Sequence, residues 1–202
     1  MIVVPQFSIV QLHDLIEEIG EKSTSEILAD FSCPLDSDVE SFLKTKSIPH
    51  EKTDLSRTYL IMDFNDGKKE LIAYFTLASK PMKLENDLSK GAKRKILGTG
   101  YNPNVRFNAI LIGQLAKNYK RDHDLEITGT NILHIALLKV LEIKKLIGGR
   151  VTYLECKDDP KLRKFYEYNG FMLYTNDNGI PIRSEQGLLI YIRPTNSIKI
   201  IE

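Results

Sequence analysis

The amino-acid sequence predicts a mixed α/β (α+β) protein, and three observations support this prediction. Two alternating apolar runs within 56–78 enclose the turn residues NDGKK, which is typical of an antiparallel hairpin. Within 108–156 a strand-like run, a long apolar helical pattern and a second strand follow one another. Two final apolar runs within 171–194 flank an NDNG turn. Strands and helices are therefore interleaved along the chain.

The N-terminal part combines one short strand with helices. Residues 6–12 open as a strand, and residues 13–31 carry apolar side chains at helical spacing. A Cys-Pro pair interrupts this pattern, and Asp36 or Ser37 is suited to cap a further helix. The sequence therefore predicts a strand, a helix, a break and a second helix.

The stretch from 81 to 108 follows the hairpin and has a weaker pattern. Gly91, Gly98, Gly100 and Pro103 interrupt it, so we predict a long loop with one helical turn. Loops of this length are usually functional or mobile.

The C-terminal half returns to clear elements. A strand over 108–116 precedes a helix over 128–147, which Gly148-Gly149 ends and whose apolar surface predicts heavy burial. The run RVTYLEC predicts the next strand. After it, Asp159-Pro160 begins a short helix that Asn169-Gly170 ends.

Composition limits the classes of protein that remain. A chain of 202 residues suffices for one domain, and we predict a single domain over 1–202. With 42% hydrophobic and 27% charged residues and a net charge of +1, it has no global attraction to nucleic acid or membrane. Cys33 and Cys156 match no metal spacing, so we expect no metal site. The absence of a signal-peptide pattern predicts a cytoplasmic protein with free thiols and no membrane association.

The junction between the strand at 111–118 and the helix that opens at ITGTNIL has the features of an anion site. A polar, basic loop, KRDHDLE, lies between them. The first amides of a helix have no partner within the helix and attract anions. The segment FYEYNGF at 165–171 adds a tyrosine at the end of a short helix. Together these segments predict a phosphate-bearing cofactor beside a phenolic acid.

This order of elements resembles the GCN5-related N-acetyltransferase (GNAT) superfamily over nearly the whole chain. LIGQLAKN resembles the family's fourth strand, and RVTYLECKDDPKLRKFYEYNGF resembles its fifth strand and fourth helix, where FYE-x-x-GF is a recurrent ending. The resemblance implies the GNAT fold, with a mixed central sheet, a mostly antiparallel N-terminal part and flanking helices. It also implies an enzyme that transfers an acetyl group from acetyl-CoA to a primary amine.

The resemblance assigns the contacts with acetyl-CoA to two short segments. Main-chain atoms of the fourth strand would meet the acetyl and pantetheine parts, from Gln114, Leu115, Ala116 and Lys117. The pyrophosphate would lie at the following loop and helix start, which comprise Lys120, Arg121, Ile127, Thr128, Gly129 and Thr130. The family's Q/R-x-x-G-x-G/A loop is largely missing, because only Gly129 matches one of its glycines. Backbone amides would hold a pyrophosphate whatever the side chains are.

Amine acetylation requires an uncharged amine, donors for the developing oxyanion and a proton for the departing thiolate. Tyr166 matches the family tyrosine that protonates this thiolate, although its helical spacing is equally that of a core residue. Tyr168 lies on another face and is the weaker candidate. The sequence does not identify a general base, and three carboxylates remain open beside water: Asp63, Glu70 and Glu155.

The acceptor is also left open. The segment from CPLDSDVESFLKTK to SRTYLIMD resembles a GNAT subgroup that includes toxins of toxin–antitoxin pairs, whose members acetylate aminoacyl-tRNA. A basic cluster supports tRNA as a partner and comprises Lys90, Lys93, Arg94, Lys95 and Arg106. The near-neutral net charge opposes it. A non-catalytic acyl-CoA-binding protein is a third alternative, motivated by the eroded loop. The final segments LLIYIRP and SIKIIE offer an edge for dimerisation.

Overall fold

The structure, a computed structural model, describes residues 7–65, 68–84, 88–100, 102, 106–120 and 127–199. Contacts between Cα atoms divide it into two compact units. The first unit comprises the described residues up to Ala78 and those from Gly113 to Ala136. The second comprises those from Ser79 to Ile112 and from Leu137 onward. The prediction of a single domain over 1–202 stays a prediction.

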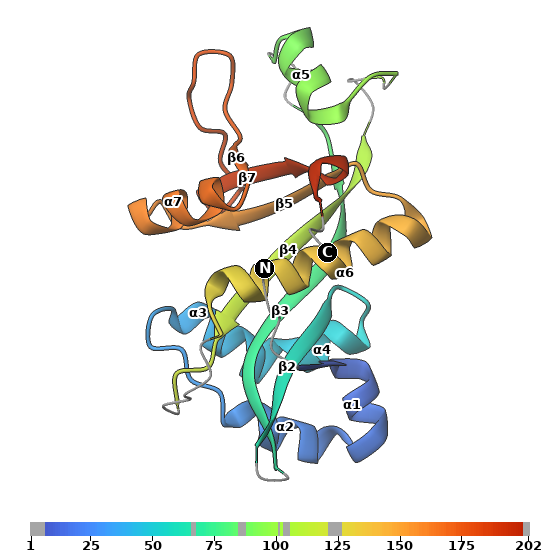
Figure 1. Cartoon of the computed structure of the whole chain (residues 1–202), viewed down its shortest axis with the longest axis vertical. Coiled ribbons are helices and arrows are strands. Elements are labelled where there is room, and N and C mark those ends of the chain that lie inside the picture. Colours follow the sequence, from blue (N-terminus) through green and yellow to red (C-terminus); the bar gives the residue numbers. More distant parts are fainter. Residues whose placement is uncertain are drawn as a thin grey trace. The chain divides into compact units, whose positions relative to one another are not determined.

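The elements are labelled in Figure 1. The first unit contains β1 (Ser8–Gln11), α1 (Leu12–Ile19), α2 (Glu21–Ala29), α3 (Ser37–Ser41), the π-helix η1 (Phe42–Lys46), α4 (Ser47–Lys52) and β2 (Arg57–Asn65). Three elements run from one unit into the other: β3 (Lys68–Met82), β4 (Phe107–Lys117) and α6 (Gly129–Ile147). The second unit contains α5 (Lys90–Leu97), β5 (Val151–Cys156), α7 (Pro160–Tyr168), β6 (Met172–Leu173), β7 (Leu189–Pro194) and the 3₁₀-helix η2 (Thr195–Ser197).

The strands form a mixed seven-stranded sheet in the order β1-β2-β3-β4-β5-β7-β6. β1 pairs with β2, and β2 with β3, in antiparallel register. β4 and β5 are parallel and are joined through α6, which is the usual way to connect parallel neighbours. β5 and β6 both pair antiparallel with β7. The predicted mixed sheet with a mostly antiparallel N-terminal part is therefore confirmed.

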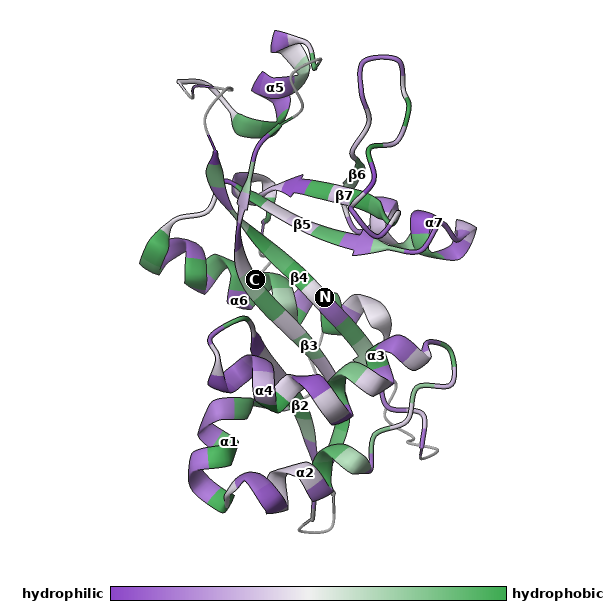
Figure 2. Ribbon diagram, turned by 180° about the vertical axis from the view of Figure 1, so that it is seen from behind, coloured by the Kyte–Doolittle hydropathy of each residue, from purple (hydrophilic) through white to green (hydrophobic). Residues whose placement is uncertain are grey.

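The helix predicted over 13–31 is two helices rather than one. Gly20, between α1 and α2, has φ 81° and ψ 159°, a backbone conformation that glycine adopts readily and other residues avoid. The chain leaves the helical path there and starts again at Glu21. Hydrophobic and hydrophilic residues alternate along α1 in Figure 2, as expected for a helix that buries one face.

Asp36 caps the next helix, α3, and is one of the two residues that the sequence predicted for this role. Its side chain accepts a hydrogen bond from the amide of Asp38 at 3.1 Å. Val39 of this helix packs against the hydrophobic core of the first unit, in which the Phe31 ring meets the Tyr74 ring edge to face at 5.2 Å. The Tyr74 hydroxyl donates to the carbonyl of Val39 at 2.5 Å, so this tyrosine also holds the middle of α3.

The predicted long loop over 81–108 was wrong for its middle part, which forms the eight-residue helix α5. Ser89 caps it by accepting from the amide of Ala92 at 3.2 Å, and Ile96 and Leu97 are buried in the core of the second unit. Arg150 donates to the carbonyl of Leu97 at 2.7 Å and so satisfies the other helix end. These tertiary contacts offset the glycines that weaken the local pattern.

The remaining C-terminal predictions hold with two exceptions. Asp159 caps α7 and Asn169 follows its last residue, as predicted. Burial of α6 extends to Val140, but Leu146 and Ile147 in its last turn are 82% and 65% exposed. Beyond β7 the chain forms η2, so the predicted strand SIKIIE does not begin at Ser197; residues 200–202 lie outside the described part.

Gly149 gives a test of this packing. It has φ 131°, and an added Cβ would lie 2.9 Å from Ile110 Cδ1, whereas at Gly148 (φ 80°) an added Cβ meets nothing within 4 Å. We expect Gly149→Ala to lower the free energy of unfolding by about 2–4 kcal/mol through backbone strain and overpacking. Gly148→Ala should lower it by about 1–2 kcal/mol from strain alone. Urea denaturation measures both, and equal losses would contradict the contact with Ile110.

Candidate functional site

The parallel ladder of β4 stops before the strand does. Its pairs with β5 run from Ala109↔Val151 to Ile112↔Leu154. β4 itself continues through Lys117. The backbone of these further residues belongs to the segment that the sequence assigned to acetyl-CoA.

Hydrogen bonds to β3 show which way this backbone faces. The amide of Gln114 donates to Thr76 Oγ1 at 2.9 Å, and the amide of Asn118 donates to a carbonyl of β3 at 2.8 Å. In an extended strand the N–H and C=O groups of one residue point to one edge and those of the next residue to the other. The backbone groups of Leu115 and Lys117 therefore point to the edge away from β3.

The four predicted strand residues differ in how far their side chains are buried. Ala116 is 6% exposed and belongs to the core of the first unit. Gln114, Leu115 and Lys117 are half-buried. A ligand along this edge would meet main-chain atoms, as the resemblance implies.

Asn118, which the sequence analysis did not select, holds the end of β4. The residue is 4% exposed. Its Oδ1 accepts from the amides of Ser32 and Lys120, both at 3.0 Å, and its Nδ2 donates to the carbonyl of Leu71 at 2.8 Å. One buried amide side chain therefore joins β3, β4 and the segment after α2.

The next two residues strengthen this junction. The amide of Tyr119 donates to the carbonyl of Ser32 at 2.7 Å. Lys120 forms an ion pair with Asp30, so its ammonium group is engaged by a carboxylate within the first unit. Arg121 lies outside the described residues, as does the loop up to 126.

The start of α6 carries a reciprocal cap. The amide and the hydroxyl of Thr128 donate to Asn131 Oδ1 at 2.9 and 2.5 Å, and the amide of Asn131 donates to Thr128 Oγ1 at 3.1 Å. This is the geometry of a capping box with asparagine in the third helical position. Ile127 is 3% exposed, which anchors the chain just before the cap.

The cap leaves the first two backbone amides of α6 without a hydrogen-bond acceptor inside the helix. Gly129 and Thr130 occupy the first two helical positions, where an α-helix provides no internal acceptor for the amide. The first turn contains no acidic residue. The cap itself is neutral, so among the described residues from Ile127 to Asn131 no carboxylate opposes the positive end of the helix dipole.

Tyr166, the predicted acid, is half-buried among other rings on α7. Its ring centroid lies 5.7 Å from that of Tyr191 and 6.2 Å from that of Phe171. Tyr191 is fully buried and donates to Glu167 at 3.1 Å. Burial and this bond raise the pKa of Tyr191 to about 12, so that hydroxyl stays protonated beside Tyr166 at neutral pH. The Tyr166 ring is thus fixed by packing on two sides.

The other candidates for chemistry are engaged elsewhere or buried. Asp63 and Glu70 stand opposite each other on β2 and β3, and Glu155 is half-buried on β5, so the base stays unassigned. Burial raises the pKa of Cys33 and raises that of Cys156 to about 11, which disfavours a reactive thiolate.

Among the described residues no group of three or more His, Cys, Asp or Glu side chains could hold a metal ion. No helix in the described part of the chain is both long and apolar enough to cross a membrane.

Solved structures match the fold, whereas no protein-family model and no curated protein matches the sequence. A tyrosine-to-phenylalanine mutant of KacT is 20% identical, with 95% of this chain and 96% of that chain covered and a TM-score of 0.66. AtaT complexed with acetyl-methionyl-tRNAfMet is 17% identical, with coverages of 95% and 96% and a TM-score of 0.66. An AtaT mutant toxin bound to the C-terminus of the antitoxin AtaR and to acetyl-CoA is 16% identical, with coverages of 84% and 86% and a TM-score of 0.59.

These likenesses show the fold. The described elements and the sheet are those of the GNAT fold, and the structures that share it include toxins. The predicted fold class and its resemblance to the toxin-like GNAT proteins are confirmed.

Asn118 offers a test of the junction. In Asn118→Asp the ionised carboxylate still accepts from two amides but cannot donate to the carbonyl of Leu71. We expect a loss of about 2–3 kcal/mol in the free energy of unfolding at pH 7. Burial and the facing carbonyl would raise the pKa of the new carboxyl above its unfolded value. The loss is therefore present above the folded-state pKa and shrinks as the pH falls through it.

Urea denaturation between pH 4 and pH 7 measures this loss. Asn178→Asp, at an exposed position, is the matched control and should change little at either pH. A loss for Asn118→Asp that does not depend on pH would contradict the donor role of the asparagine.

Proposed function

We propose that this protein is an acetyl-CoA-dependent N-acetyltransferase that acts on a primary amine. The observation that carries the proposal is the open edge of β4, with the backbone groups of Leu115 and Lys117 turned away from β3, in a chain with the GNAT fold. An AtaT toxin with the same fold has been solved with acetyl-CoA, which supports this choice of co-substrate.

The residues present fit the two ends of acetyl-CoA that the resemblance assigns to them. Pantetheine is an extended chain of two amides, and it can pair with backbone groups as a strand does. The amides of Gly129 and Thr130 lie at a helix start whose cap carries no charge, and they suit a pyrophosphate. Ile127 is buried, so only its backbone would take part. Thr128 contributes through the cap that it forms with Asn131.

The reaction assigns a separate role to Tyr166. The neutral amine attacks the thioester carbonyl, a C–N bond forms and the C–S bond breaks. The departing thiolate takes the phenolic proton of Tyr166, and the proton released by the new amide returns to the tyrosine through solvent. The ring packing of Tyr166 would hold its hydroxyl in one orientation.

A substitution at Asn131 can distinguish an effect on acetyl-CoA binding from an effect on the stability of α6. In Asn131→Asp the new carboxylate still accepts from Thr128, so the cap is kept and a negative charge is added at the helix start. This charge should leave thermal stability unchanged or raise it by about 0.3–1 kcal/mol. The same charge should weaken acetyl-CoA binding about tenfold or more by repelling the pyrophosphate.

Calorimetry with acetyl-CoA and thermal melting of the same variant make the two measurements. Asn178→Asp adds an equal charge at an exposed position and serves as the control. Unchanged acetyl-CoA affinity in Asn131→Asp would exclude the start of α6 as the phosphate site. No binding of acetyl-CoA to the native protein at millimolar concentration would reject the enzyme altogether.

Tyr166→Phe tests the acid. We expect kcat to fall about 100-fold or more, while the affinity for acetyl-CoA and the melting temperature stay within error. Tyr153→Phe, a half-buried tyrosine of β5, is the control and should keep its activity. Release of coenzyme A thiol with saturating substrates is the readout, and full turnover in Tyr166→Phe would remove the general-acid role.

Aminoacyl-tRNA is the second candidate acceptor, and α5 favours it. Lys90, Arg94, Lys95 and Arg106 are exposed, and α5 contains no acidic residue. Lys93 is 7% exposed and so falls out of the predicted cluster. The structure of AtaT with acetyl-methionyl-tRNAfMet adds support.

Thiol release with a panel of free amines and with charged tRNA separates the two acceptors. Activity confined to charged tRNA would select the second candidate, and activity confined to free amines would select the first. Binding of acetyl-CoA without thiol release for any acceptor would instead support the non-catalytic alternative.

A further inference from the structure

Two residues of β7 hold the last turn of α7, which carries Tyr166. The Tyr191 hydroxyl donates to Glu167 Oε1 at 3.1 Å, and the Arg193 guanidinium donates to the carbonyl of Asn169 at 2.9 Å. Tyr191 and Arg193 are two positions apart, so their side chains leave the same face of β7. The end of α7 is therefore attached to the sheet at two points.

Tyr191 supports Tyr166 in a second way, through its ring. The two ring centroids lie 5.7 Å apart, with an angle of 40° between the ring planes. Tyr191 is fully buried, so its ring is held by close packing on all sides. One buried side chain thus contacts the proposed acid directly and also holds the residue that follows it, Glu167.

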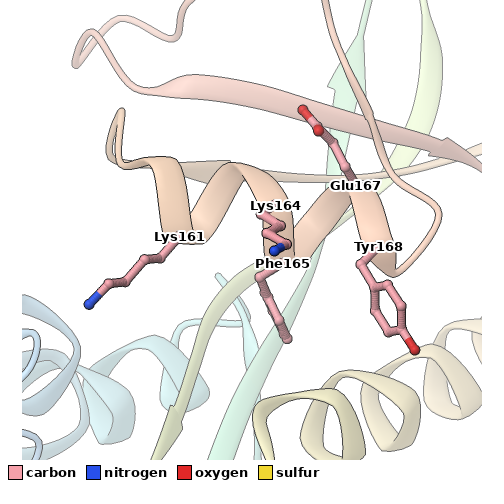
Figure 3. Close-up of a pocket in the computed structure, with 5 residues that line it drawn as sticks. All are labelled: Lys161, Lys164, Phe165, Glu167 and Tyr168. Atoms are coloured by element: carbon pink, nitrogen blue, oxygen red, sulfur yellow. The ribbon is translucent and has the colours of Figure 1, made fainter.

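Glu167 is the exposed partner in this arrangement. Its side chain lines the open hollow along α7, together with Lys161, Lys164, Phe165 and Tyr168. Figure 3 shows its carboxylate directed to the opposite side of the helix from the rings of Phe165 and Tyr168. An exposed glutamate loses side-chain entropy when it is held in one position. The buried Tyr191 hydroxyl provides the fixed donor that holds it there.

Helix geometry converts this hydrogen bond into an orientation for Tyr166. Neighbouring residues of an α-helix lie about 100° apart around its axis. A bond that fixes Glu167 against β7 therefore sets the rotation of the last turn and the direction in which Tyr166 leaves it.

The last turn of α7 also moves as one piece. The side-chain amide of Asn169 donates to the carbonyl of Phe165 at 2.8 Å. The backbone amide of Phe171 donates to the carbonyl of Tyr166 at 3.0 Å. A displacement at Glu167 is therefore passed on to Tyr166 and is not absorbed between the two residues.

We propose that Tyr191 and Glu167 are positioning residues for acetyl transfer, and that their hydrogen bond directs the Tyr166 hydroxyl towards the departing thiolate. The inference rests on the proposed function, because it takes Tyr166 as the acid. In this role both residues act through the orientation of Tyr166 and touch no reacting atom. Loss of the bond should lower kcat and leave the KM for acetyl-CoA unchanged, since it affects proton transfer and not binding.

Three variants separate the hydrogen bond from the ring and from the charge. Tyr191→Phe keeps the ring and removes the hydroxyl, and Glu167→Ala removes the acceptor. Each should lower kcat about ten- to a hundred-fold, the size of effect expected from a misplaced catalytic group. Glu167→Gln keeps an acceptor oxygen without the charge and should retain the native kcat. Tyr191→Phe combined with Glu167→Ala should lose no more than either alone, because both remove the same bond.

Release of coenzyme A thiol at a range of acetyl-CoA concentrations measures kcat and KM, with the free amine or charged tRNA that supports native turnover as acceptor. Thermal melting shows that each variant folds. Tyr153→Phe, on the neighbouring strand β5, and Glu142→Ala, an exposed glutamate of α6, are the controls and should keep the native kcat. Native kcat in Tyr191→Phe, or equal losses in Glu167→Ala and Glu167→Gln, would overturn the proposal.

Nuclear magnetic resonance of ring-labelled tyrosine tests the orientation without turnover. The Tyr166 signal is identified by its loss in Tyr166→Phe. Tyr191→Phe keeps the neighbouring ring, so a shifted Tyr166 signal in that variant reports a movement of the Tyr166 ring, whereas Glu167→Gln should leave the signal in place.

The two readouts distinguish failure of the inference from failure of the proposed function. A native protein that transfers no acetyl group to any acceptor would reject the proposed function, and the Tyr166 signal would still decide whether Tyr191 orients that ring. An unshifted Tyr166 signal in Tyr191→Phe, in an active enzyme, would overturn the positioning role alone.

Discussion

The buried side-chain amide of Asn118 fixes the end of β4, and the rest of the proposed cofactor site depends on it. The Asn118 residue is 4% exposed, and three hydrogen bonds hold its side chain: Oδ1 accepts from the amides of Ser32 and Lys120, and Nδ2 donates to the carbonyl of Leu71. Leaving any of them unmade would cost about 1–3 kcal/mol. The strand therefore has one favourable way to end, which sets where the chain begins its path towards α6.

This constraint also decides which backbone groups are available along β4. The backbone amides of Asn118 and Gln114 both donate towards β3, so the even-numbered residues between them direct their backbone groups to that strand. Leu115 and Lys117 must then face the other edge. The alternation of backbone hydrogen bonds along β4 decides which groups such a site offers to a ligand. A change of side chain at Leu115 would leave these groups in place so long as the strand stays in register.

Local features of the fold could be predicted from the sequence, and distant contacts could not. Asp159 and Asp36 were recognisable as caps because a cap depends on residues two or three positions away. Two of the three partners of Asn118 lie 47 and 86 residues away, so no local pattern identifies its role in joining distant segments. The same reason applies to α5, whose apolar side chains find their core only in the folded second unit. Gly20 is the local signal for the break between α1 and α2, because a glycine with positive φ interrupts the helical path.

For the candidate site, the sequence predicted the segments better than the roles within them. Tyr166 and Tyr168 differ by two positions, and helical periodicity places them on different faces without deciding which face is buried. Packing decides it, because Tyr191 and Phe171 surround only the first ring. Similarly, the sequence places Lys93 with the other cations of the basic cluster, but its position on α5 leaves it buried.

The eroded glycine loop is compatible with anion binding for a physical reason. Glycines in such a loop allow backbone amides to approach a phosphate closely, and a helix start supplies amides of its own. In this chain the Thr128–Asn131 cap uses neutral side chains, so the cap itself adds no carboxylate at the positive end of the helix. A Glu in the third helical position would complete a more common capping box and would oppose the phosphate. Asparagine at that position therefore keeps the helix start suited to a phosphate, although most of the loop's usual glycines are missing.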